Sequence, residues 1–188
     1  MKRAIILHGK PGKSEHYDVK YPSPSNSHWI PWLSKQLITR DILAVAPEIP
    51  YAYEPKYEIW KKEVERFEID SDTMLIGHSC GGGFWVRYLS ENKDIQVGKV
   101  VLVSPSMGLE WEDRSFFEFE IDPDLKSRTE GITIFTSDND LPTCQKSSKI
   151  YADTLGAELI SLPNHGHFRF EEMGTEEFPE LLKTLVED

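Results

Sequence analysis

A serine stands between glycines in the stretch Gly77-His78-Ser79-Cys80-Gly81, directly after a short apolar run. The pattern G-x-S-x-G is typical of a tight turn between a strand and a helix, which projects the serine hydroxyl above a sheet. A hydroxyl is a weak nucleophile until a base removes its proton, and that base needs a third group to hold its tautomer. Ser79 is therefore a candidate nucleophile, and the alternative is a glycine-rich turn without chemistry.

Candidate acids and bases occur later in the chain, in the order that this arrangement requires. Asp138 and Asp140 follow one apolar run, and His165 and His167 follow the next. Because Asp138 is as far from His165 as Asp140 is from His167, spacing alone leaves both pairs open. The backbone amide of Cys80, directly after the serine, is a candidate donor to an oxyanion.

The elements that must position these residues follow from hydrophobic periodicity. Short apolar runs predict strands buried on both faces at 4–7, 42–46, 73–77, 99–104, 132–136 and 157–162. Apolar residues at helical spacing predict helices at 29–38, 57–67, 83–90, 145–155 and 176–186. The alternation predicts an α/β fold, a single domain over residues 1–188 with a mostly parallel sheet of about six strands. The carboxyl ends of the strands then bring the candidate residues to one edge of the sheet.

Two longer segments, 10–27 and 105–131, follow the first and fourth predicted strands and so border the same edge. The second segment carries Phe116, Phe117 and Phe119. These rings belong either to a lid over the site or to a surface loop, and the sequence favours neither.

Six segments in a fixed order make the chain resemble an α/β-hydrolase, and more narrowly the small hydrolases of the retinoblastoma-binding serine hydrolase and YdeN-like family. They are "ILHG", "HWIPWL", "IGHSCGG", "LVSP", "SDND" and "GHF", and they span nearly the whole chain. The resemblance implies a three-layer α/β/α sandwich with a minimal cap. It also implies a serine hydrolase that cleaves a small carboxylic ester through an acyl-enzyme, with no metal and no organic cofactor.

The resemblance also assigns roles to individual residues. It implies that Ser79 is the nucleophile, His167 the base and Asp140 the acid, and that the Lys10 amide joins that of Cys80 in binding the oxyanion. The chain departs from the family at the acid. Here a Leu-Pro pair follows Asp140 directly, whereas the family usually has two residues between them, so Asp138 remains an alternative.

The composition excludes several other classes of function. A net charge of −11 argues against a nucleic-acid partner, and no apolar run approaches the length of a membrane span. The two cysteines, Cys80 and Cys144, form no CxxC pair, which indicates neither a disulfide framework nor a cysteine zinc site. We therefore expect a reducing, cytoplasmic location.

Two further patterns suggest other ligands but lack essential parts. "GKPGKS" resembles the end of a phosphate-binding P-loop, but Leu7 occupies the position of its first glycine. His165 and His167 form an H-x-H pair without the third ligand and general base of a zinc hydrolase. We expect one catalytic histidine and one turn residue there.

A protein-binding module with little or no turnover is the alternative function, because a hydrolase fold can persist as a platform for a protein partner. Neither cysteine lies in an L-x-C-x-E motif of the kind that binds the retinoblastoma pocket. A platform would have no reason to keep a nucleophile, an acid and a base at three strand ends. The sequence therefore favours an enzyme.

Overall fold

Six parallel strands form the centre of the molecule in this computed structural model, which describes residues 1–187. The strands are β1 (Arg3–Leu7), β2 (Leu43–Val45), β3 (Thr73–His78), β4 (Val100–Val103), β5 (Ile132–Ser137) and β6 (Glu158–Leu162). Their order across the sheet is β2-β1-β3-β4-β5-β6, and every neighbouring pair is parallel. The predicted parallel sheet is confirmed.

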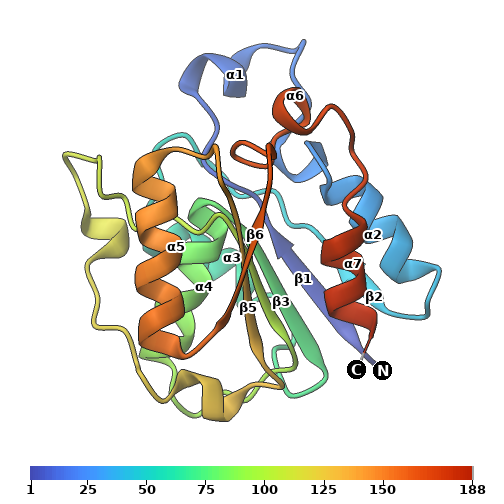
Figure 1. Cartoon of the computed structure of the whole chain (residues 1–188), viewed down its shortest axis with the longest axis vertical. Coiled ribbons are helices and arrows are strands. Elements are labelled where there is room, and N and C mark those ends of the chain that lie inside the picture. The colour runs from blue at the N-terminus through green and yellow to red at the C-terminus, as the bar shows by residue number, and fades with distance from the viewer. Residues whose placement is uncertain (188) are drawn as a thin grey trace.

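Helices cover both faces of this sheet, as predicted, and give three layers (Figure 1). One face carries α2 (Ile30–Ile38) and α7 (Pro179–Val186), and the other carries α3 (Tyr57–Val64), α4 (Cys80–Glu91) and α5 (Pro142–Leu155). Each face has its own apolar core. Two short helices, α1 (Lys13–Tyr17) and α6 (Phe170–Met173), lie together beyond the carboxyl ends of the strands.

The prediction that all six strands are buried on both faces is wrong for the two edge strands. Four residues or more of each central strand are buried, whereas Leu43 of β2 and Glu158, Leu159 and Ser161 of β6 are exposed. Both edge strands carry apolar residues, so their hydropathy resembles that of the central strands. Only their position in the sheet exposes them.

Helix α2 begins one residue after its predicted start, and three other helices begin three residues away from theirs. Helix α4 begins at Cys80 instead of residue 83, α5 at Pro142 instead of 145, and α7 at Pro179 instead of 176. Glycine is a poor helix former, which concealed the first turn of α4. Proline is favoured in the first turn of a helix, where its missing N–H has no partner to lose, and this marks the starts of α5 and α7.

The segment between β4 and β5 is not a plain surface loop. It contains the 3₁₀ turns η2 (Ser115–Phe117) and η3 (Leu125–Arg128), and both Phe116 and Phe117 are buried in the core beside α3 and α4. The Phe116 ring lies 5.3 Å from that of Trp60. These aromatic rings pack η2 against the helical layer. Nearer the candidate residues, the Ser106 amide donates to the Ser79 carbonyl oxygen (3.0 Å), and the Trp111 ring lies 5.4 Å from Lys10 Nζ.

Candidate active site

Ser79 lies in the sharp turn between β3 and α4, with a left-handed backbone conformation (φ 51°, ψ −114°). Such a conformation is strained for a residue with a side chain. The turn closes only because glycines flank it. A Cβ on Gly77 would lie 2.5 Å from the backbone carbon of Gly81, and a Cβ on Gly81 would lie 2.6 Å from the carbonyl oxygen of Leu7. The predicted elbow is therefore present, and its glycines have a steric reason.

A chain of hydrogen bonds links Ser79, His167 and Asp140. His167 Nε2 lies 2.9 Å from Ser79 Oγ, and His167 Nδ1 lies 2.9 Å from Asp140 Oδ1. The Asp140 side chain is fully buried, whereas that of His167 is 15% exposed. Since the carboxylate can only accept, Nδ1–H donates to Asp140 and Nε2 is free to accept from the serine hydroxyl.

Asp138 and His165 lie outside this chain and have a different role. The Asp138 carboxylate accepts a hydrogen bond from the backbone amide of Asn164 (2.8 Å). The His165 ring bonds the carbonyl oxygen of Pro163 (2.8 Å), and its amide donates to Ser137 Oγ (2.9 Å). These contacts fix the loop after β6 that carries His167.

Ser104 is a residue of the site that the sequence did not single out. Its hydroxyl donates to Asp140 Oδ2 and lies 3.0 Å from His167 Nδ1. Ser104 directly follows β4, is fully buried, and has a left-handed backbone (φ 46°). Ser104 lies in the stretch "LVSP". A single serine after a strand does not reveal its role, because no second residue stands at a fixed spacing from it.

Two further side chains hold the backbone of His167. The imidazole of His78, next to Ser79, donates from Nε2 to the His167 carbonyl oxygen (2.8 Å). Glu172 Oε2 accepts from the His167 amide (2.7 Å). A Cβ on Gly166 would lie within 3 Å of three Glu172 side-chain atoms, so the glycine makes room for this contact. Both backbone polar groups of His167 are thus held by side chains.

The backbones of Lys10 and Cys80 lie beside the elbow. Cys80 is the first residue of α4, and its thiol lies near the Lys10 amide. The loop carrying Lys10 passes close to the nucleophile, because a Cβ on Gly9 would lie 3.1 Å from Ser79 Cβ. Among residues 1–187 neither amide takes part in a backbone–backbone hydrogen bond. The two amides remain the predicted donors to an oxyanion at Ser79.

The family model of the serine hydrolases matches residues 21–187, most of the chain. The chain belongs to the serine hydrolase family. It is 27% identical to YdeN of Bacillus subtilis (strain 168), over 91% of this chain and 88% of YdeN.

Solved structures show the same fold. The crystal structure of the B. subtilis ydeN product superposes with a TM-score of 0.82 at 24% identity, over 99% of this chain and 97% of that one. Est1E of Butyrivibrio proteoclasticus, solved with ferulic acid, has a TM-score of 0.68 at 14% identity, over 99% and 88% of the two chains. The predicted α/β-hydrolase fold and YdeN-like family are confirmed.

The histidines of this serine hydrolase site have different pKa values. Burial lowers the pKa of His167, but the hydrogen bond to Asp140 and the nearby Cys144 outweigh it and raise the pKa to about 9. The pKa of His78 is well below its ordinary value, because the ring is completely buried and faces two other histidines. His78 is therefore a neutral hydrogen-bond donor, while His167 can take up and return a proton.

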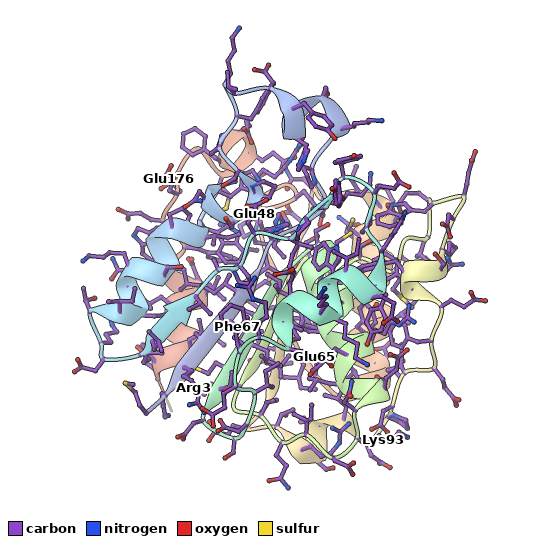
Figure 2. All side chains as sticks on the ribbon, turned by 180° about the vertical axis from the view of Figure 1, so that it is seen from behind. Arg3, Glu48, Glu65, Phe67, Lys93 and Glu176 are labelled. Atoms are coloured by element: carbon purple, nitrogen blue, oxygen red, sulfur yellow. The ribbon has the colours of Figure 1, made fainter. Side chains whose placement is uncertain are left out.

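A cleft of about 760 Å³ opens above Ser79 and His167. One wall comes from residues 9–28, and the other from residues 167–176. The walls touch where the Phe170 amide donates to His28 Nδ1 (3.2 Å). Glu48 and Glu176 also line the cleft. In Figure 2 both lie toward the end of the molecule that carries α1, whereas Arg3 of β1 lies toward the opposite end.

The H-x-H pair does not gather metal ligands. Within residues 1–187 the one group of potential ligand atoms contains Asp140, Cys144 and His167, without His165. Asp140 Oδ1 and His167 Nδ1 in this group already bond each other. The described part of the chain also contains no helix that is long and apolar enough to cross a membrane.

Proposed function

We propose that this serine hydrolase cleaves a small carboxylic ester through an acyl-enzyme, with Ser79, His167 and Asp140 as its catalytic triad. The observation that carries the proposal is the hydrogen-bond chain from Ser79 Oγ through the His167 ring to the buried Asp140 carboxylate. Such a chain activates a hydroxyl because the imidazole accepts its proton while the carboxylate stabilises the imidazolium.

In the acylation half of this mechanism, Ser79 Oγ attacks the ester carbonyl carbon and His167 Nε2 accepts the hydroxyl proton. The tetrahedral oxyanion receives hydrogen bonds from the amides of Lys10 and Cys80. The intermediate collapses, the bond to the leaving group breaks, and His167 returns the proton to the departing alcohol. The products are an acyl-serine and the free alcohol.

Water completes the cycle through the same groups. His167 Nε2 takes a proton from water, the resulting hydroxide attacks the acyl carbonyl, and the acid leaves as Ser79 recovers its proton. The proposal includes no metal and no organic cofactor, since each proton has a donor and an acceptor among these residues.

A small-molecule ester is the proposed partner. The cleft volume, about 760 Å³, is within the range that small-molecule sites occupy. The structural neighbour Est1E binds ferulic acid, a carboxylic acid, which supports acyl chemistry on this fold. The net charge of −11 disfavours nucleic acid as a partner. A cytoplasmic location and the absence of a membrane partner remain our predictions.

A fluorophosphonate probe tests the proposal, because it phosphonylates only activated serines. We expect the wild-type protein to be labelled and Ser79→Ala to remain unlabelled while keeping its circular-dichroism spectrum. A panel of p-nitrophenyl esters, from acetate to decanoate, then tests the substrate, and we expect the highest kcat/KM for the short acyl chains. A folded wild-type protein that neither labels nor hydrolyses any ester would contradict the proposal and favour the protein-binding module.

A further inference from the structure

We propose that Ser104 is a positioning residue of the active site, whose hydroxyl orients the Asp140 carboxylate and shares the Nδ1 proton of His167. The proposal rests on the proposed function, since it concerns how the acid and the base are held for catalysis. Nothing in the G-x-S-x-G pattern or in the order of acid and histidine predicts a second serine at this place.

The two carboxylate oxygens of Asp140 accept hydrogen bonds from different donors. Oδ1 accepts from the Leu141 amide (2.6 Å) and from His167 Nδ1 (2.9 Å). In the described part of the chain, Ser104 Oγ is the one donor to Oδ2. The Asp140 side chain is fully buried, so water cannot replace this donor. Without Ser104 the carboxylate would keep bonds on one oxygen only and could rotate.

Ser104 lies at the carboxyl end of a central strand of the sheet. Strand β4 lies between β3, which leads to Ser79, and β5, which leads to Asp140. Ser104 follows the last residue of β4, and its amide donates to the Phe135 carbonyl (2.8 Å). The hydroxyl therefore comes from the strand end between those that lead to Ser79 and Asp140, and it contacts Asp140 and His167.

The backbone of Ser104 has an unusual conformation. Ser104 is one of the few residues other than glycine with a positive φ, and Ser79 is another. A left-handed conformation at a residue with a side chain costs free energy, and such residues concentrate at active sites. Glycine would adopt this φ without strain. The serine at this position is explained by its hydroxyl, which reaches two polar groups of the site.

A purely structural role makes different predictions from a positioning role. If Ser104 only fills space, its removal lowers stability and leaves the chemistry of His167 unchanged. If it orients Asp140, its removal concentrates the carboxylate charge on the oxygen that faces His167. Within residues 1–187, the other titratable groups near this ring are Cys144 from α5, His78 from the end of β3 and His28 before α2. They remain unchanged in the variants, so a changed titration of His167 reports on Ser104.

The test compares Ser104→Ala and Ser104→Gly with the matched control Ser148→Ala. Ser148 is also fully buried, but its hydroxyl has no partner within residues 1–187. We expect both Ser104 variants to lower kcat and the rate of fluorophosphonate labelling about 10- to 100-fold, with KM changed less than about twofold. We expect the ascending limb of the pH profile to shift by about 0.5 pH unit or more, because both the hydrogen bonding of Asp140 and the contact at Nδ1 change. The control should match the wild type.

Ser104→Gly provides a variant that we expect to fold even if Ser104→Ala does not. It removes the hydroxyl and also relieves the backbone strain. Wild-type kcat and an unmoved pH limb in either folded variant would overturn the proposal. Proton NMR of the His167 Nδ1–H resonance separates this failure from failure of the proposed function. If the wild type is inactive toward probe and esters, the proposed function fails, while a resonance that moves in Ser104→Ala and not in Ser148→Ala still supports the contact.

Discussion

The carboxylate of Asp138 accepts a hydrogen bond from the backbone amide of Asn164, three residues before His167, at a distance of 2.8 Å. The next side chain, Asn139, accepts from the Gly166 amide, also at 2.8 Å. The loop that carries Asp140 is therefore hydrogen-bonded to the loop that carries His167. Of the two aspartates that spacing could not distinguish, one contacts the imidazole and the other holds the backbone that presents it.

These contacts predict unequal effects of two isosteric substitutions. Asp140→Asn should lower kcat by about 10³-fold or more, because an amide in this place favours the wrong tautomer of His167. Asp138→Asn keeps an oxygen that can still accept from Asn164, so its kcat should stay within about threefold of the wild type. Steady-state kinetics on a p-nitrophenyl ester measures both. A larger loss in Asp138→Asn than in Asp140→Asn would reverse the assignment of the acid.

The position of these residues in the fold could be predicted from the sequence, because each follows a short apolar strand and parallel strands end at one edge. The elbow was predictable for the same reason, since its glycines serve a backbone that must pass close to itself. The roles of Ser104, His78 and Glu172 could not be predicted. The contacts of Ser104 and His78 join residues 36 to 89 positions apart, and that of Glu172 joins residues five apart, so no local pattern records them.

The pH dependence of activity follows from the raised pKa of His167, about 9. A protonated ring cannot accept the Ser79 proton, so kcat/KM should rise with pH and level off above about 9, instead of near the ordinary histidine value of about 6.5. Cys144→Ala removes a side chain that raises this pKa and should move the limb to lower pH. A wild-type limb near 6.5, unmoved in Cys144→Ala, would contradict the prediction.

The same pKa predicts how stability depends on pH. Because the folded protein holds the His167 proton more tightly than the unfolded chain, this group stabilises the fold fully below about pH 6.5. The contribution is lost as pH rises through about 9. Urea denaturation of the wild type and of His167→Gln at pH 6 and pH 10 measures it. The difference between the two proteins should be larger at pH 6, and an equal difference at both pH values would argue against it.

A methyl group on Gly77 should disrupt the elbow. Its Cβ would lie 2.5 Å from three backbone atoms of Gly81 and Gly82, which cannot move aside as a side chain can. We expect Gly77→Ala to lower the free energy of unfolding by about 2–3 kcal/mol. Gly12→Ala is the control, since the new methyl would meet only the flexible end of Glu15. Equal unfolding midpoints of the two variants in urea would show that the elbow tolerates the methyl.

Loss of the Glu172 carboxylate should leave the backbone of His167 held less firmly and its imidazole in place. Glu172→Ala deletes the acceptor for the His167 amide, and we expect kcat to fall about 10-fold while fluorophosphonate labelling persists at a lower rate. Glu177→Ala, an exposed change in the same segment, should have the kinetics of the wild type. If the two variants behave alike, the His78 contact alone is sufficient to hold His167.

The bond between His28 and the Phe170 amide joins the wall that faces the substrate to the loop that carries the base. Displacing residues 9–28 to admit a bulkier ester would strain this bond and pull on His167 through the short segment between them. A variant selected for a broader range of esters should therefore lose turnover on the small ones. We therefore predict that this one hydrogen bond sets tolerance for large esters against turnover of small ones.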